Sequence, residues 1–280
     1  LKRTLHQTTN ILVYPATEAV NGFLLPTGRV PGGESTRHRT HYLTANVATV
    51  RDYVPGDSFN RMHWRSTART GRLIVKEFEL DPTSDVWIVL DLDPTWHHAQ
   101  PWNPPDYAEQ PAILWGHSPS DIDLIPSTIE YAVTAAASLA RRYLTERRAV
   151  GLISYTTHRE IIQADRGERQ MHKILETLAM LEPNGTLPFD RVLAAEGNYL
   201  GRASTVIAIT PSADNAWIAS LRELGRRGVQ STAIVLAAST FGPAPDSEEA
   251  VAELWASRVP TYTLRNGDAI GAALSEYARP

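Results

Sequence analysis

The chain has 280 residues, of which 42% are hydrophobic and 21% are charged, an ordinary balance for a globular protein. It contains no cysteine, which excludes disulfides, thiolate metal sites and cysteine nucleophiles. The net charge of −4 is uneven, because residues 1–80 hold 11 basic against 6 acidic residues and the remaining 200 hold 16 against 25. This asymmetry is either a chance imbalance on a solvated surface or a basic docking face for an acidic partner.

The first 80 residues are predicted to form a small β-rich domain. Short apolar runs recur at 11–14, 22–25 and 73–75, separated by proline and glycine. Such runs without a helical period are typical of strands joined by turns.

Residues 81–280 show a different pattern, in which apolar runs alternate with amphipathic helices. The run at 86–90 is continuously apolar, as expected of a central strand that is buried on both faces. The clearest helix begins at Ser127, where Glu130 completes a capping box, and an antiparallel edge strand is predicted at 157–164. We therefore predict an α/β domain with a mainly parallel sheet flanked by helices.

Polar residues follow the strands at the edge where parallel sheets bind ligands. Asp91, Asp93 and Thr95 come directly after the first buried run, while Thr186 precedes a helix and Thr210 follows a later strand. Oxygen ligands of this kind suit Mg²⁺, Mn²⁺ or Ca²⁺. The alternative is structural, because Asp and Thr are also common in turns and at helix starts.

The connection at 92–126 is much longer than the usual loop of a few residues. One interpretation is a lid that recognises a partner, and the other is an insertion that packs its tryptophans on the body. The candidate partner-binding residues in it are Trp96, His97, His98, Trp102 and Trp115.

Residues 50–73 carry the most specific motif of the chain. Its fixed positions are Arg51, Tyr53, Pro55-Gly56-Asp57, His63-Trp64 and Ala68-Arg69. The motif resembles the signature of the bacterial family known as domain of unknown function 58. The resemblance implies a von Willebrand factor A-like, Rossmann-like domain after the β-rich one, two membrane helices ahead of this region, and a MoxR-type AAA+ ATPase as partner. It implies no established catalysis.

The motif also has a direct physical interpretation. Pro55-Gly56 sets a turn, and Trp64 is expected to anchor a small core. Arg65 and Arg69 either pair with nearby carboxylates or form a face that docks an anionic group.

Von Willebrand factor A-like domains often bind a cation through a D-x-S-x-S motif, a threonine in a second loop and an aspartate in a third. Asp91 matches the first ligand, Thr95 replaces one serine, and Asp93 stands where the other serine is usual. The resemblance therefore implies a metal-ion-dependent adhesion site with altered ligands.

The second and third loops complete the comparison with this motif. Thr186 after Gly185 resembles the second-loop threonine, but Thr210 is followed by Pro211 where aspartate is expected. We therefore expect a degenerate adhesion site.

The leading functional hypothesis is a non-enzymatic adaptor that presents client proteins to a MoxR-type ATPase. The alternative is a metal-dependent hydrolase using Asp91 and Asp93, although no known nucleophile or zinc-protease motif occurs. Nucleic-acid binding is disfavoured by the isoelectric point of about 6.2.

The location is predicted from the resemblance. No apolar run reaches the roughly 18 residues that span a bilayer, so we expect no membrane contact by these residues. The chain begins with Leu1 instead of methionine, so we expect a fragment of a membrane-anchored protein on the cytoplasmic side of the bacterial membrane.

Overall fold

A computed structural model describes residues 12–25, 47–54, 62–78, 85–103, 124–201 and 204–275, with only the backbone at 47–51 and 76–78. The chain divides into two compact units. The larger unit combines Leu1–Gly28 with Asp85–Pro280, and the smaller unit is Arg29–Ser84. The described residues 12–25 thus lie in the larger unit, whereas the sequence analysis grouped them with the β-rich domain.

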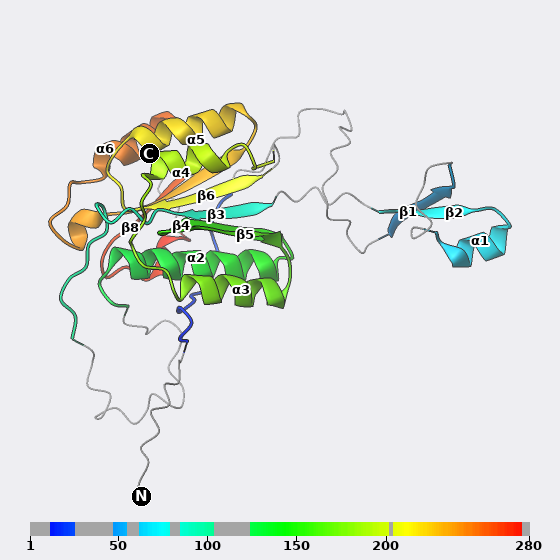
Figure 1. Ribbon diagram of the computed structural model, residues 1–280, viewed down its shortest axis with the longest axis horizontal. Coiled ribbons are helices and arrows are strands. Elements are labelled where there is room, and N and C mark those ends of the chain that lie inside the picture. Colours follow the sequence, from blue (N-terminus) through cyan, green and yellow to red (C-terminus); the bar gives the residue numbers. More distant parts are fainter. Residues whose placement is uncertain are drawn as a thin grey trace, which may run out of the picture. The chain divides into compact units, whose positions relative to one another are not determined.

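The larger unit is built on one six-stranded sheet (Figure 1). Its strand order is β5-β4-β3-β6-β7-β8, and every neighbouring pair is parallel except β4 with β5. Counted along the chain this order is 3-2-1-4-5-6, the order of doubly wound α/β folds. The strands are β3 (Val86–Leu90), β4 (Val150–Tyr155), β5 (Arg159–Asp165), β6 (Thr205–Thr210), β7 (Gln230–Leu236) and β8 (Thr261–Leu264).

Two sequence predictions about this sheet are confirmed. Strand β3 lies between β4 and β6 with all five residues buried, as its unbroken apolar run indicated. Strand β5 is the antiparallel edge strand predicted at 157–164.

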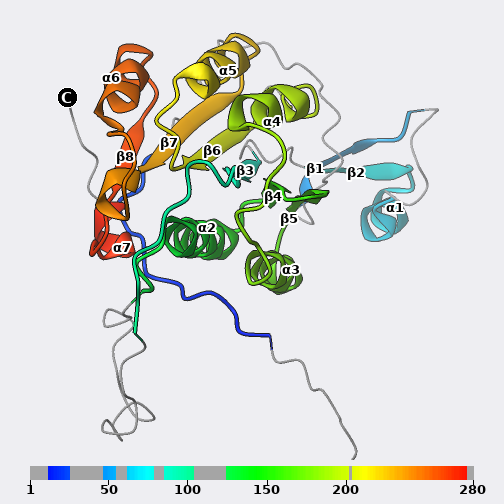
Figure 2. The same ribbon diagram turned by 60° about the vertical axis from the view of Figure 1, so that its left-hand side comes forward.

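Helices cover both faces of the sheet, as Figure 2 shows. One face carries α2 (Thr128–Thr145), α3 (Glu168–Leu178) and α7 (Ile270–Ala273), and the other carries α4 (Phe189–Glu196), α5 (Ala216–Arg226) and α6 (Glu248–Ala256). Each face encloses its own hydrophobic cluster, one around Ile88 and Leu139 and the other around Val89 and Trp217. The strands, and the loops that leave their carboxyl ends, are therefore supported by packed helices on both faces of the sheet.

The start of α2 differs from the predicted capping box. Ser127 is the N-cap residue, but its side chain forms no capping hydrogen bond. The Thr128 N–H instead donates to the His98 carbonyl, at 2.9 Å. The backbone of the preceding loop thus satisfies one of the N–H groups that a helix start leaves without an intrahelical partner.

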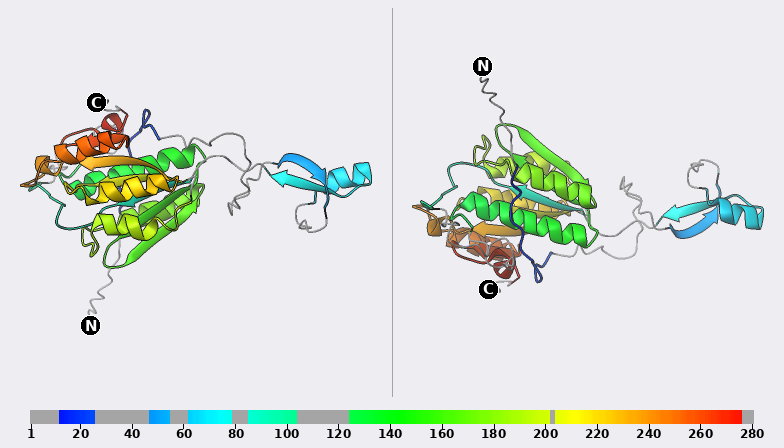
Figure 3. Two further views of the ribbon diagram at one scale, coloured as in Figure 1. Left: turned by 90° about the horizontal axis from the view of Figure 1, so that it is seen from above. Right: turned by 90° about the horizontal axis from the view of Figure 1, so that it is seen from below.

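The N-terminal segment 12–25 crosses the outer side of α2 and α7 (Figure 3). The Glu18 N–H donates to Ser138 Oγ of α2 at 2.9 Å, and the Gly271 N–H of α7 donates to the Glu18 carboxylate at 2.7 Å. Phe23 stacks on Tyr262 with ring centroids 4.4 Å apart. These contacts and the burial of Val20 and Phe23 explain why this segment belongs to the larger unit.

In its described residues, the smaller unit contains one antiparallel strand pair and one short helix. Strands β1 (Val47–Asp52) and β2 (Ile74–Phe78) pair, and α1 (Trp64–Thr70) precedes β2. Among its described side chains, Met62, Ile74 and Val75 are buried. Trp64 is 63% exposed, so the expectation that it anchors a core is wrong. The predicted turn at Pro55-Gly56-Asp57 lies outside the described residues.

Candidate functional site

The loops that follow β3 and β6 meet at the carboxyl edge of the sheet. Asp91 directly follows β3, and its N–H donates to the Ile209 carbonyl of β6 at 2.9 Å. The Thr210 hydroxyl donates to Asp91 Oδ2 at 2.5 Å, and the Asp93 N–H donates to Asp91 Oδ1 at 3.1 Å. Both oxygens of this carboxylate are therefore engaged within the protein.

Asp91 is the most perturbed acid of this edge. Its side chain is 1% exposed, and burial raises the pKa of its carboxyl group from 3.8 to about 7. The hydrogen bonds from Thr210 and Asp93 lower this pKa, but the loss of hydration outweighs them, and the Asp93 charge raises it further. The Asp91 carboxyl therefore titrates near neutral pH.

Asp93 and Thr95 continue the same loop as a turn. Asp93 Oδ1 accepts from the Thr95 N–H at 3.0 Å, and the Trp96 N–H donates to the Asp93 carbonyl at 3.2 Å. Each carboxylate thus caps the N–H two residues ahead, as in an Asx turn. Asp91 and Asp93 thus have the role in turns that the sequence analysis gave as the alternative to metal binding. The second oxygen of the Asp93 carboxylate is left for a ligand.

The loop after α3 rests directly on this turn. The Gly185 N–H donates to the Leu92 carbonyl at 2.8 Å. A Cβ atom at position 185 would lie 2.7 Å from that carbonyl oxygen and 2.8 Å from the one of Tyr155. Only glycine allows this approach, and it places the exposed Thr186 next to the turn that contains Asp93.

The loop after β6 contains an acidic residue that the sequence analysis did not single out. The Thr210 hydroxyl accepts from the Ser212 N–H at 2.9 Å, Ser212 Oγ accepts from the Asp214 N–H at 3.1 Å, and Asp214 Oδ1 accepts from the Ala216 N–H at 3.1 Å. The polar spacing 210, 212 and 214 repeats the spacing 91, 93 and 95. That repeat was visible in the sequence and is the signal that could have identified Asp214.

The His97 side chain contacts the backbone of Asp91 and the first residue of α2. Its Nε2 lies 2.9 Å from the Asp91 carbonyl oxygen and its Nδ1 lies 3.0 Å from Thr128 Oγ1. Burial lowers the pKa of the His97 imidazole, which favours the neutral ring. A carbonyl oxygen only accepts, so Nε2 carries the proton. Thr128 Oγ1, which lies beside Nδ1, also donates to the His98 carbonyl at 3.2 Å. This ring braces the backbone of Asp91.

The described ends of the 92–126 connection are fixed beside the site. The Gln100 N–H donates to the Pro126 carbonyl at 2.9 Å, and Gln100 Nε2 donates to the Thr240 carbonyl at 3.0 Å. Trp96, His98 and Trp102 are half-buried. Trp115 lies outside the described residues, as does everything from 104 to 123.

The donor set fits a divalent cation only in part. Asp93 and the hydroxyls of Thr95 and Thr186 are hard oxygen donors, but both Asp91 oxygens accept protein hydrogen bonds. Among the described residues, no group of three or more His, Asp or Glu side chains is placed to hold a metal ion.

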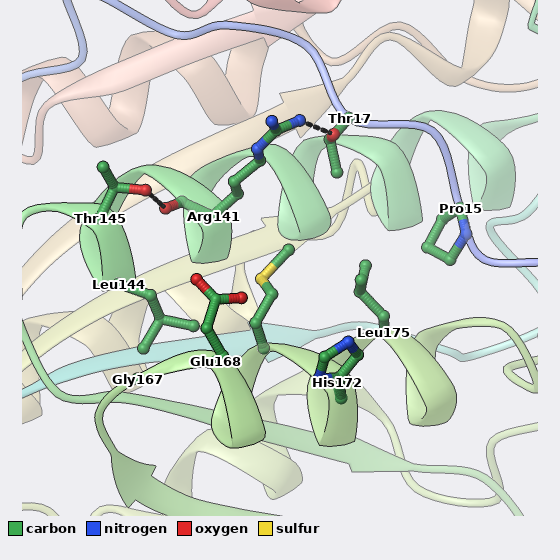
Figure 4. Close-up of a pocket in the computed structure, with 10 residues that line it drawn as sticks. Pro15, Thr17, Arg141, Leu144, Thr145, Gly167, Glu168, His172 and Leu175 are labelled. Carbon is green, nitrogen blue, oxygen red and sulfur yellow. Dashed lines mark hydrogen bonds between the residues drawn. The ribbon is translucent and has the colours of Figure 1, made fainter.

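A separate cavity lies near the C-terminal end of α2, at the opposite end of that helix from this site. Arg141, near that C-terminal end, donates to Thr17 Oγ1 of the N-terminal segment at 2.8 Å, beside the cavity of about 390 Å³ (Figure 4). The cavity is also lined by α3 residues, including Glu168 and His172. None of the predicted site residues lines it.

Arg65 and Arg69 belong to the smaller unit, where both are exposed on α1. Within the described residues, no helix is both long and apolar enough to cross a membrane.

Comparison with known proteins supports the family resemblance. A sequence model of the family described as "Protein of unknown function DUF58" matches residues 49–100. The uncharacterized protein YeaD of Bacillus subtilis (strain 168) is 24% identical over 172 residues, which cover 61% of this chain. The chain spans about a third of that relative, at 34% of its length.

Two crystal structures of the pilus adhesin SpaC from Lactobacillus rhamnosus GG show a limited structural likeness. Both match 70% of this chain with a TM-score of 0.45, at 11% and 10% sequence identity. The match covers 30% and 29% of the SpaC chains.

Proposed function

We propose that the larger unit is a von Willebrand factor A-like adaptor that binds proteins at the carboxyl edge of its sheet and does not catalyse a reaction. The observation that carries this proposal is the hydrogen bond from Thr210 to Asp91. It joins the loops after β3 and β6, which leave the sheet where the strand order reverses, the position at which doubly wound folds bind ligands.

The chemistry of the edge favours a polar group of a client protein as the ligand. Asp93, Thr95 and Thr186 offer a carboxylate and two hydroxyls at or near the surface. Trp96 follows Thr95 in the same loop and is half-buried, and tryptophan is the residue most typical of interface anchors. A cation, if it binds, binds through Asp93 and the hydroxyls as a degenerate adhesion site, and client binding does not depend on it.

The partnership with a MoxR-type AAA+ ATPase rests on the family resemblance alone. In this proposal the adaptor captures clients and presents them to the ATPase at the cytoplasmic face of the membrane.

The test immobilises the full chain and compares the host proteins captured by the native chain and by Asp93→Ala, with Glu176→Ala as the control. Glu176 is an exposed acid on α3, away from the site. We expect clients that Asp93→Ala loses and Glu176→Ala retains. An identical set of captured proteins for all three chains contradicts the proposal.

Two measurements separate the remaining alternatives. A melting temperature that is unchanged by millimolar Mg²⁺, Mn²⁺ or Ca²⁺ removes the cation from the proposal, since a ligand that binds only the folded state must stabilise it. Metal-dependent hydrolysis of a phosphate ester that Asp93→Ala abolishes replaces the adaptor with the hydrolase that uses Asp91 and Asp93.

A further inference from the structure

Helix α1 of the smaller unit packs through one side only. His63 Nδ1 accepts from the Ser66 N–H at 3.2 Å at its start, and Gly71 ends it with a positive φ of 68°. The Thr67 hydroxyl accepts from the Ile74 N–H at 3.0 Å, which holds this side of the helix against β2. No residue of α1 is buried, so its other side faces solvent.

That other side combines one tryptophan with arginines. Trp64, Arg65, Ala68 and Arg69 are exposed, whereas Ser66 and Thr67 are half-buried. At roughly 100° per residue, these four side chains fall within an arc of about 140°, whereas the exposed Thr70 lies outside it, on the side of Ser66 and Thr67. The exposed Arg72 follows the helix. We call Trp64, Arg65, Ala68, Arg69 and Arg72 the α1 face.

The stability of the helix explains only part of the α1 face. Arg69 lies in the last turn, where a cation is favourable to the helix dipole. Arg65 lies in the first turn, where a cation is unfavourable and an acid is preferred. Trp64 is 63% exposed, although burial is the main stabilising contribution of a tryptophan.

Among the described residues, the arginines of the α1 face also have no acidic partner. Helix α1 contains no acidic residue. In the part of the chain that the structure describes, Arg65, Arg69 and Arg72 form no side-chain hydrogen bond or ion pair. Three guanidinium groups and a tryptophan are thus free to contact another molecule.

We propose that the α1 face binds an acidic segment of a partner protein. Guanidinium groups pair with carboxylates through two parallel hydrogen bonds, and tryptophan and arginine are the residues most enriched in interface hot spots. Trp64 covers an apolar side chain that lies beside the acidic residues of the partner. This inference goes beyond the adaptor proposal, because it uses a different surface and does not require the strand-edge site.

The charge of the smaller unit favours an acidic protein segment over a long polyphosphate. Residues 29–84 contain nine Lys and Arg against six Asp and Glu, a net charge of +3. Affinity for nucleic acid depends on many neutralised phosphates, which such a mixed charge supports poorly. A short acidic segment needs only the three arginines of the α1 face.

The experiment measures the binding of the full chain to a labelled peptide that repeats Glu-Glu-Leu, with a Gln-Gln-Leu peptide for comparison. The test variants are Arg65→Glu/Arg69→Glu and Trp64→Ala. The control is Arg169→Glu/Lys173→Glu, which reverses two exposed charges with the same spacing of four residues, on α3 of the larger unit.

We expect binding of the acidic peptide that weakens with added salt and is absent for the Gln peptide. The Arg65→Glu/Arg69→Glu and Trp64→Ala chains should each bind at least about tenfold more weakly, and the control should bind like the native chain. Melting curves check that each variant is folded.

Three outcomes overturn the proposal. The first is no binding of the acidic peptide at millimolar concentration. The second is equal weakening by the α3 control, which indicates nonspecific attraction by net charge. The third is tighter binding of single-stranded DNA or phosphatidylserine vesicles with the same dependence on the α1 face, which assigns that face to a polyphosphate or a membrane.

Discussion

The two units of this chain differ in what their sequences specify. In the larger unit, β3, β6 and the helices between them bury nearly every apolar side chain, and the periodicity of the sequence follows this burial. In the smaller unit, the described buried side chains are Met62, Ile74 and Val75. Nevertheless the match to the family begins in the smaller unit and covers residues 49–100.

This contrast separates two kinds of sequence information. A long buried core tolerates many apolar sequences and is predictable by pattern, but it carries little that identifies a family. Caps, turns and surface positions require particular residues. His63 caps α1, and Gly71 adopts a positive φ, whereas the family-matching Trp64 is exposed. The family match therefore includes exposed and capping positions of the smaller unit as well as the buried strand β3 of the larger one.

The largest expected effect in the larger unit is the dependence of its free energy of unfolding on pH, which Asp91 controls. Its carboxyl pKa is about 7 when folded, against 3.8 for the free group, so the folded state holds a proton that the unfolded chain has lost. The free energy of unfolding contributed by Asp91 is then complete below pH 3.8 and is lost as the pH rises to about 7. The whole loss amounts to about 4 kcal/mol, at 1.36 kcal/mol per pKa unit.

The measurement is urea unfolding from pH 4 to pH 8 for the native chain and for Asp91→Asn. Burial lowers the pKa of His97, so His97 acts in the opposite direction and destabilises the folded state as the pH falls through 6.5 and below. Because His97 is present in both chains, the difference between them isolates Asp91. A difference that is constant with pH means that Asp91 is ionised throughout.

A smaller effect is expected where two loops of the larger unit touch. In Gly185→Ala the new Cβ would lie 2.7 Å from the Leu92 carbonyl oxygen, so one loop must move, at a cost of roughly 1–3 kcal/mol. Gly225→Ala is the control, because it lies within α5 with no atom within 4 Å of the new Cβ. It should stabilise the protein by up to about 1 kcal/mol. Thermal unfolding compares the two, and equal effects would show that position 185 tolerates a side chain.

The sequence predicted most of the larger unit because its central strands β3 and β6 are fully buried. The continuous apolar run at 86–90 indicated a central strand, and the segment from Thr157 to Ala164 indicated the antiparallel edge strand. The approach of the loops after β3 and β6 also followed from topology, since parallel strands end at one edge. The hydrogen bond between Asp91 and Thr210 is the direct result.

Contacts between distant segments were not predictable in this way. The packing of Phe23 on Tyr262 depends on which surface an extended segment crosses, and no periodicity records that. The position of His97 beneath Asp91 depends on how a long connection turns back toward α2. In the smaller unit, helix α1 was missed because its seven residues are too few to show an apolar stripe.

The smallest expected effect is the one that most directly tests the smaller unit. Because Trp64 is 63% exposed, Trp64→Ala should change the free energy of unfolding of this unit by no more than about 0.5 kcal/mol. Met62 is 2% exposed, so Met62→Ala should cost roughly 2–5 kcal/mol. Hydrogen exchange reports this unit by itself through the Tyr53 and His63 amides, which donate to Leu73 and Ile74 carbonyls. Faster exchange in Met62→Ala with unchanged exchange in Trp64→Ala is the predicted result. If both variants exchange equally fast, Trp64 is a core residue after all, and a loss of peptide binding in Trp64→Ala would then reflect unfolding instead of a lost contact.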